Sequence, residues 1–66
     1  MTQGEAIVIE FRALRCLKQA ETNGEFMQTA RTFARRAARK LHAAKYFAEA
    51  SSVAKKLLTV TADNTI

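Results

Sequence analysis

Proline and tryptophan are absent from this 66-residue chain, and cysteine and histidine occur once each. The single cysteine, Cys16, excludes a disulfide within the chain, and the single histidine, His42, excludes a Cys/His zinc site built from one copy. Gly4 and Gly24 are the only glycines, so the chain lacks a glycine-rich loop of the kind that binds phosphate. The longest apolar run, residues 6–9, is far shorter than the roughly 20 residues of a membrane-spanning helix.

The most informative stretch that is present, residues 25–48, carries six Lys/Arg and one acidic residue, with neither glycine nor proline. Placed at 100° per residue, its apolar side chains fall within an arc of roughly 100°. This seam of large and small residues comprises Phe26, Ala30, Phe33, Ala34, Ala37, Leu41, Ala44 and Ala48. The opposite side is cationic, with a row of residues four apart and a second row beside it: Arg31, Arg35 and Arg39, then Arg36 and Lys40. The stretch predicts one amphipathic helix with a packing seam and a basic back.

The N-terminal segment predicts a helix with two apolar faces. Thr2 and Glu5 have the T-x-x-E spacing of a capping box, so a helix can begin there. The apolar residues form two stripes about 130° apart: Ile7, Phe11, Leu14 and Leu17 in one, and Ile9, Ala13, Cys16 and Ala20 in the other. A strand over the β-branched residues 7–9 would have no second strand to pair with. A helix with two such faces can contact a partner helix and a further neighbour.

The segment Thr22-Asn23-Gly24 is the one turn signal in the sequence. Asn and Gly tolerate positive φ, Gly is preferred just past a helix end, and Asn23 is suited to cap the next helix. After this turn, the apolar phase rotates by about 140° near residue 50. Serines 51 and 52 offer one explanation, a break in the second helix, but the lack of Gly and Pro favours a continuous helix.

The predicted fold is therefore all-α, a single domain over residues 1–66 formed by an antiparallel helical hairpin. Its elements are a helix over about 3–22, a turn at 22–24, a long helix over about 25–59 with the alternative break near 51–52, and a frayed tail over about 60–66.

The unequal lengths of these two helices predict a homodimer. The second helix would be near 50 Å long and the first about 30 Å, so the second overhangs. The overhang carries apolar residues that a monomeric hairpin would leave in water, and the predicted dimer interface is Phe47, Val53, Ala54, Leu57 and Leu58. A second hairpin would cover them, giving an assembly that resembles a four-helix bundle.

The scarcity of reactive side chains bears on catalysis and on location. General acid–base chemistry needs paired carboxylates or a histidine held in a pocket, and two packed helices offer no concave pocket around Cys16 or His42. We therefore expect no enzymatic activity, no catalytic residue, no cofactor, no metal and no small-molecule substrate. A free thiol suits a reducing compartment, and no basic segment precedes residues 6–9 as in a secretory signal, so the sequence predicts a cytoplasmic protein.

The net charge of +5 resides on the central helix, because residues 26–45 carry six cations and no acid. The candidate binding residues are Arg31, Arg35, Arg36, Arg39 and Lys40. One interpretation is a solvated face paired across the hairpin, which would place Glu10 near Arg36 and Glu5 near Lys40–His42. The others are docking of an acidic protein, sequence-independent contact with nucleic-acid phosphates, and association with a membrane surface, for which the alanine-rich seam is poorly suited.

In size and basicity the chain resembles the small accessory proteins of phages and plasmids, which implies binding to a host protein or to nucleic acid. The functional hypothesis from sequence is a regulatory or interaction protein that dimerises and binds an acidic protein partner through its basic helix face. The alternative hypothesis is a nucleic-acid-binding protein that contacts phosphates through Arg31, Arg35 and Arg39.

Overall fold

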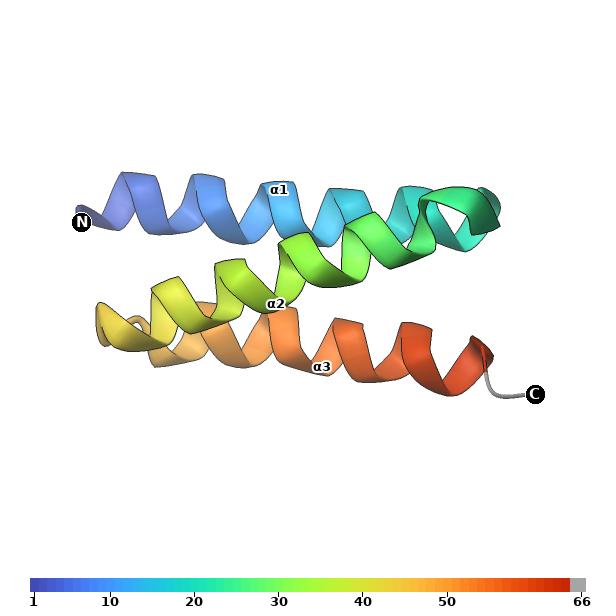
Figure 1. Cartoon of the computed structure of the whole chain (residues 1–66). Coiled ribbons are helices and arrows are strands. Elements are labelled where there is room, and N and C mark those ends of the chain that lie inside the picture. Colours follow the sequence, from blue (N-terminus) through green and yellow to red (C-terminus); the bar gives the residue numbers. More distant parts are fainter. Residues whose placement is uncertain (65–66) are drawn as a thin grey trace.

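Three helices make up the part of the chain that the computed structural model describes, the backbone of residues 1–64 and the side chains of residues 1–60. Helix α1 spans Gln3–Thr22, α2 spans Met27–Ala43 and α3 spans Phe47–Asn64, and a short 3-10 turn, η1 at Gly24–Phe26, precedes α2. The described residues contain no strand, so the all-α prediction is confirmed. Helix α2 runs antiparallel to α1 and α3, and each pair of helices is in contact (Figure 1).

Helix α1 begins as the sequence predicts. The hydroxyl oxygen of Thr2 accepts a hydrogen bond from the Glu5 N–H at 3.2 Å, and the Glu5 carboxylate accepts one from the Thr2 N–H at 3.4 Å. This capping box pairs N–H groups that the start of a helix otherwise leaves unpaired. The first connection also lies where it is predicted, but the Asn23 side chain caps nothing, and neither Asn23 nor Gly24 has a positive φ.

The prediction of one long helix over about 25–59 is wrong, because the chain turns at residues 44–46. Lys45 adopts the left-handed conformation, with φ 70°. Its N–H donates to the His42 carbonyl at 2.9 Å, and the Tyr46 N–H donates to the Leu41 carbonyl at 2.9 Å. These two bonds form a Schellman motif, a common helix ending. Residues 51–52 are helical within α3, so the alternative break point is wrong as well.

The rotation of the apolar phase near residue 50 is explained by the turn at Lys45. Because α3 is a separate helix, it turns its own set of residues toward the core, with Ala50, Val53 and Val60 buried. The predicted hairpin is thus replaced by three helices in which α3 folds back along α1 and α2 (Figure 1). The predicted frayed tail is helical from residue 60 to Asn64, and residues 65–66 lie outside the described part.

The core of this bundle is built mostly from alanine. Among residues 1–60, seven of the eleven buried hydrophobic residues are Ala, and the largest fully buried side chains are Leu17, Leu41, Val53 and Val60. Small side chains let the helix backbones approach closely, which suits a rod of only 36 × 15 × 13 Å. In α1, the core contains Ala13 and Ala20 from one predicted stripe and Leu17 from the other, whereas Ile7 and Phe11 are exposed.

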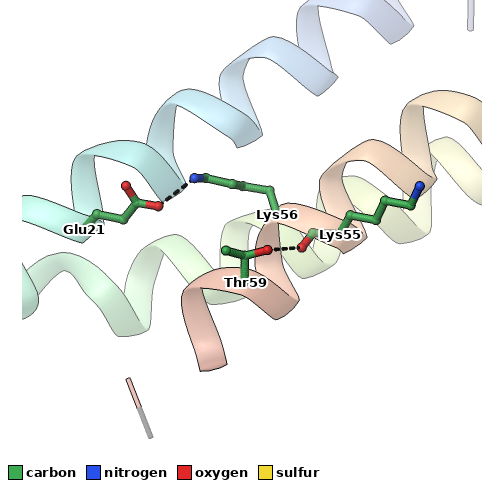
Figure 2. Close-up of polar contacts among 4 residues, drawn as sticks. All are labelled: Glu21, Lys55, Lys56 and Thr59. Atoms are coloured by element: carbon green, nitrogen blue, oxygen red, sulfur yellow. Dashed lines mark hydrogen bonds and ion pairs between the residues drawn. The ribbon is translucent and has the colours of Figure 1, made fainter. Parts of the chain in front are cut away.

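Two polar contacts join parts of the chain that lie far apart in sequence. Lys56 of α3 forms an ion pair with Glu21 of α1 at 2.6 Å, and nearby the Thr59 hydroxyl donates to the Lys55 carbonyl at 3.0 Å (Figure 2). At the other end of the bundle, the Tyr46 hydroxyl donates to the Met1 carbonyl at 3.0 Å. Over the residues described, no helix is both long enough and apolar enough to cross a bilayer.

Candidate interaction surface on the second helix

The outer face of α2 is basic over its last three turns. Arg35, Arg36, Arg39 and Lys40 are all exposed, and we call these four residues the basic face. They are solvent-facing because the apolar seam of the same helix, centred on Ala34 and Leu41, is buried against α1 and α3. At 100° per residue the four cations spread over about 140° on the side away from that seam. Four of the five predicted binding residues thus share one exposed surface.

Arg31, the fifth predicted binding residue, belongs to a different environment. Its side chain is half-buried, and its Nε atom is buried without a hydrogen-bond partner. A buried guanidinium N–H that lacks an acceptor is a cost to the fold rather than a donor presented to a ligand. We therefore leave Arg31 out of the basic face.

The basic face has no acidic neighbours in the described part of the chain. The one ion pair there is Lys56–Glu21, so no carboxylate oxygen lies within 4.0 Å of any cation of α2. The predicted pairs of Glu10 with Arg36 and of Glu5 with Lys40 do not form.

The third helix explains why Glu10 is not available to α2. Glu10 and Glu21 are eleven residues apart, close to three full turns, so they share one flank of α1. Glu21 pairs with Lys56, which places that flank on the side of α3. The predicted hairpin of two helices did not include α3, so it left this side of α1 open. Glu5 is held in the capping box at the start of α1.

A groove runs along one side of the basic face, between α1 and α2. Its residues combine an apolar floor with a basic rim, and we call this the α1–α2 groove: Ile9, Arg12, Phe33, Arg36, Ala37 and Lys40. Phe33 was predicted to lie in the packing seam, but it sits at the edge of the seam and is 42% exposed. Arg12 was not among the predicted binding residues. Arg12 lies three residues after Ile9, so both side chains are on the flank of α1 that faces α2. This spacing is the sequence signal that could have identified Arg12.

A second groove lies on the other side of the basic face, between α2 and α3. This α2–α3 groove has a volume of about 390 Å³ and is lined by Ala38, Arg39, His42, Ala43, Phe47, Ala50, Ser51 and Ala54. The edge of one ring meets the face of the other where His42 contacts Phe47, with ring centroids 5.0 Å apart. Phe47 still exposes 55% of its surface. The basic face is therefore flanked by apolar hollows on both sides.

The five residues predicted as a dimer interface are divided between the core and the surface. Val53 is fully buried within the chain and Leu57 is half-buried against the core, so Val53 is not free to form an interface between copies. Phe47, Ala54 and Leu58 remain exposed, Leu58 to 69%. The sequence could not separate these two groups, because the turn at Lys45 sets the direction in which α3 faces.

The two reactive side chains considered in the sequence analysis, Cys16 and His42, lie in different environments. Cys16 is half-buried and packs against the core, whereas His42 is exposed and contacts Phe47. Among the residues whose side chains are described, no three His, Cys, Asp or Glu residues gather into a group that could hold a metal ion.

No family model, curated protein or solved structure matches the chain. The geometry of the basic face and its two grooves is therefore the basis for a functional proposal.

Proposed function

We propose that this chain is a small non-catalytic binding protein that holds an acidic partner protein against the basic face of α2. The supporting observation is that Arg35, Arg36, Arg39 and Lys40 are exposed together without a carboxylate within 4.0 Å in the described part of the chain. Like charges four residues apart destabilise a helix by roughly 0.2–0.5 kcal/mol per pair. An acidic partner removes this repulsion and gains charge-assisted hydrogen bonds to the arginines.

The two grooves favour a protein partner over a phosphate backbone. Binding to phosphates uses the cations and leaves apolar neighbours such as Ile9 and Ala54 without a contact. Protein interfaces combine an apolar centre with a polar rim, and arginine is enriched in them. The basic face with apolar hollows on either side has this composition.

Nucleic acid remains the second candidate, because aromatic rings are exposed beside the cations. Phe33 lies next to Arg36 in one groove, and Phe47 lies near Arg39 in the other. Unpaired bases stack on such rings in proteins that bind single strands without sequence preference. This candidate predicts an affinity that falls steeply with salt, with a slope near −0.7 per phosphate contact on a single strand.

The homodimer stays a prediction, with a narrower interface than the sequence implied. Because α3 covers the core within one chain, a second copy is not needed to bury Val53. The proposed contact between copies is reduced to the exposed apolar residues Phe47, Ala54 and Leu58.

Charge reversal on the basic face tests the proposed function. We expect the double substitution Arg35→Glu and Arg39→Glu to abolish capture of a specific protein from extracts of the native cell, with nuclease-treated extract as input. The matched control is Lys55→Glu, an exposed cation on α3, which should leave capture unchanged. Captured proteins are identified by mass spectrometry, and circular dichroism checks that each variant keeps its helices.

The same variants separate the two candidates. Binding to a 20-nucleotide single strand and to a 20-base-pair duplex is measured by fluorescence anisotropy at low and moderate salt. If nuclease treatment removes all specific capture, and the wild-type chain binds the oligonucleotides with the salt slope given above, the protein partner is the wrong proposal. Capture that survives nuclease and is insensitive to the double substitution would mean that another surface binds.

A further inference from the structure

We infer that the α1–α2 groove binds an acidic amphipathic helix of the partner protein. This inference rests on the proposed function and goes further, because it names the element of the partner that is recognised and includes a residue of α1. The groove is lined by apolar side chains of both helices, Ile9 from α1 and Phe33 and Ala37 from α2. Arg12 on one side and Arg36 and Lys40 on the other supply three cations around this floor.

Two further hollows adjoin the α1–α2 groove, one toward each end. One adjoining hollow shares Ile9 and Arg12 with it and continues over Val8 toward the start of α1. Another shares Phe33 and Arg36 but is lined by α2 alone, and it leads from the groove onto the outer face of that helix: Gln28, Thr29, Thr32, Phe33 and Arg36. On α2 alone, the span from residue 28 to residue 40 is about 18 Å. This length fits a helix of roughly three to four turns.

The chemistry of the groove selects the character of that helix. Ile9 and Phe33 are large apolar side chains that water reaches, Phe33 to 42%. Covering a side chain of this size contributes about 1.5–3 kcal/mol when burial is complete. Helices that bind in grooves present apolar residues at i, i+3, i+4 and i+7 toward the floor. The flanks of the incoming helix must then carry Asp or Glu to meet the cations on both sides.

A second copy of this chain is a poor occupant of the groove. Each copy carries a net charge of +5. The six residues that define the α1–α2 groove include three cations and no carboxylate. The one acidic side chain along the extended groove is Glu5. It lies at the far end, where the capping box engages it. Charge complementarity therefore favours a foreign acidic helix over self-association at this site.

A pair of synthetic peptides tests this inference directly. The probe is a 14-residue helical peptide with leucines at alternating three- and four-residue spacing and glutamates on both flanks. The comparison peptide has the same composition in scrambled order, so it carries the same charge without an apolar stripe. By fluorescence anisotropy at 50 mM NaCl, we expect the patterned peptide to bind at least ten-fold more tightly. Equal affinities, or no binding of the patterned peptide at millimolar protein, would overturn the inference.

Substitutions in α1 locate the binding site independently of the basic face. Arg12→Glu should weaken the patterned peptide at least ten-fold, whereas Arg15→Glu, an exposed cation of α1 outside the groove, should change affinity less than three-fold. Equal losses from both would show that only overall charge matters.

The apolar floor is tested by a matched pair of aromatic residues. Phe33→Ser should weaken the peptide at least ten-fold, and Phe47→Ser in the α2–α3 groove should leave its affinity within three-fold. Thermal melting by circular dichroism checks the fold of every variant. A larger loss from Phe47→Ser would move the site to the other groove.

The two proposals can fail separately. A partner protein captured from cells that is lost on reversal of Arg35 and Arg39, but retained by Arg12→Glu and Phe33→Ser, would keep the proposed function and reject the groove. A failure of specific capture by the wild-type chain would instead reject the proposed function, whatever the peptides do.

Discussion

The two faces of α2 differ in what they contribute to the molecule. The inner face is buried and apolar, with Ala30, Ala34, Ala37 and Leu41, and the outer face is the basic face, with Arg35, Arg36, Arg39 and Lys40. Burial of the inner side chains removes apolar surface from water, which is the main favourable term in folding. The outer cations stay hydrated and add only weak mutual repulsion. Stability and binding are thus assigned to opposite sides of one helix, and substitutions should separate them.

The largest expected effect comes from shortening the inner face at its one large residue. Leu41→Ala should lower the free energy of unfolding by about 2–5 kcal/mol, because Leu41 is fully buried and the alanines around it leave little to fill the cavity. Urea denaturation followed by circular dichroism measures the change. The matched control is Leu58→Ala on the exposed side of α3, which should cost less than about 0.5 kcal/mol. Similar losses from both leucines would contradict the contrast between buried and exposed positions.

Enlarging the inner face should also destabilise the fold. Ala34→Leu adds volume where α2 is packed against its neighbours, so we expect a loss of about 1–3 kcal/mol from overpacking. Ala48→Leu, an exposed position of α3, provides the control and should stay within about 0.5 kcal/mol of the parent chain. A stable Ala34→Leu variant would indicate that the helices are less closely packed than the alanine core implies.

The end of α2 offers a substitution with the opposite sign. Lys45 holds a left-handed conformation that favours glycine, so Lys45→Gly should stabilise the protein by about 1 kcal/mol. The control is Arg36→Gly within the same helix, where glycine should cost about 1 kcal/mol. Thermal or urea unfolding detects both. The turn at residue 45 would be in doubt if both glycines destabilised the chain equally.

The smallest expected effect lies on the outer face. Arg35 has a like charge four residues away on each side, so Arg35→Gln should stabilise the fold by roughly 0.2–0.5 kcal/mol per relieved pair at low ionic strength. Added salt screens the repulsion, and the gain should shrink toward zero near 0.5 M NaCl. Lys55→Gln on α3 has no charged residue three or four positions away and serves as the control. A gain that persists in high salt would have a different origin.

These two faces also differ in how well the sequence predicted them. Four of the eight predicted seam residues are buried, and Phe33 and Ala48 of that seam are exposed. Four of the five predicted cations are exposed. Residues at the border between the faces were harder to assign. Phe33 was expected in the seam and lines a groove, and Arg31 was expected outside and is half-buried with an unpaired Nε. A helical wheel gives the direction of a side chain only to within tens of degrees. At the border between the two faces, an error of this size decides whether a residue is assigned to the core or to solvent.

The sequence alone determined the features that depend on neighbours a few positions apart. The all-α class, the capping box of Thr2 and Glu5, the bounds of α1 and the first connection all follow from local spacing and local hydrogen bonds. The tertiary structure decided the turn at Lys45, the burial of Val53 and exposure of Leu58, and the ion pair between Glu21 and Lys56 of α3. A lysine in the left-handed conformation is unfavourable by itself. It is held there because the turn lets α3 bury its apolar side on α1 and α2. The free energy of this burial comes from contacts between distant segments, so a local stretch of sequence does not reveal it.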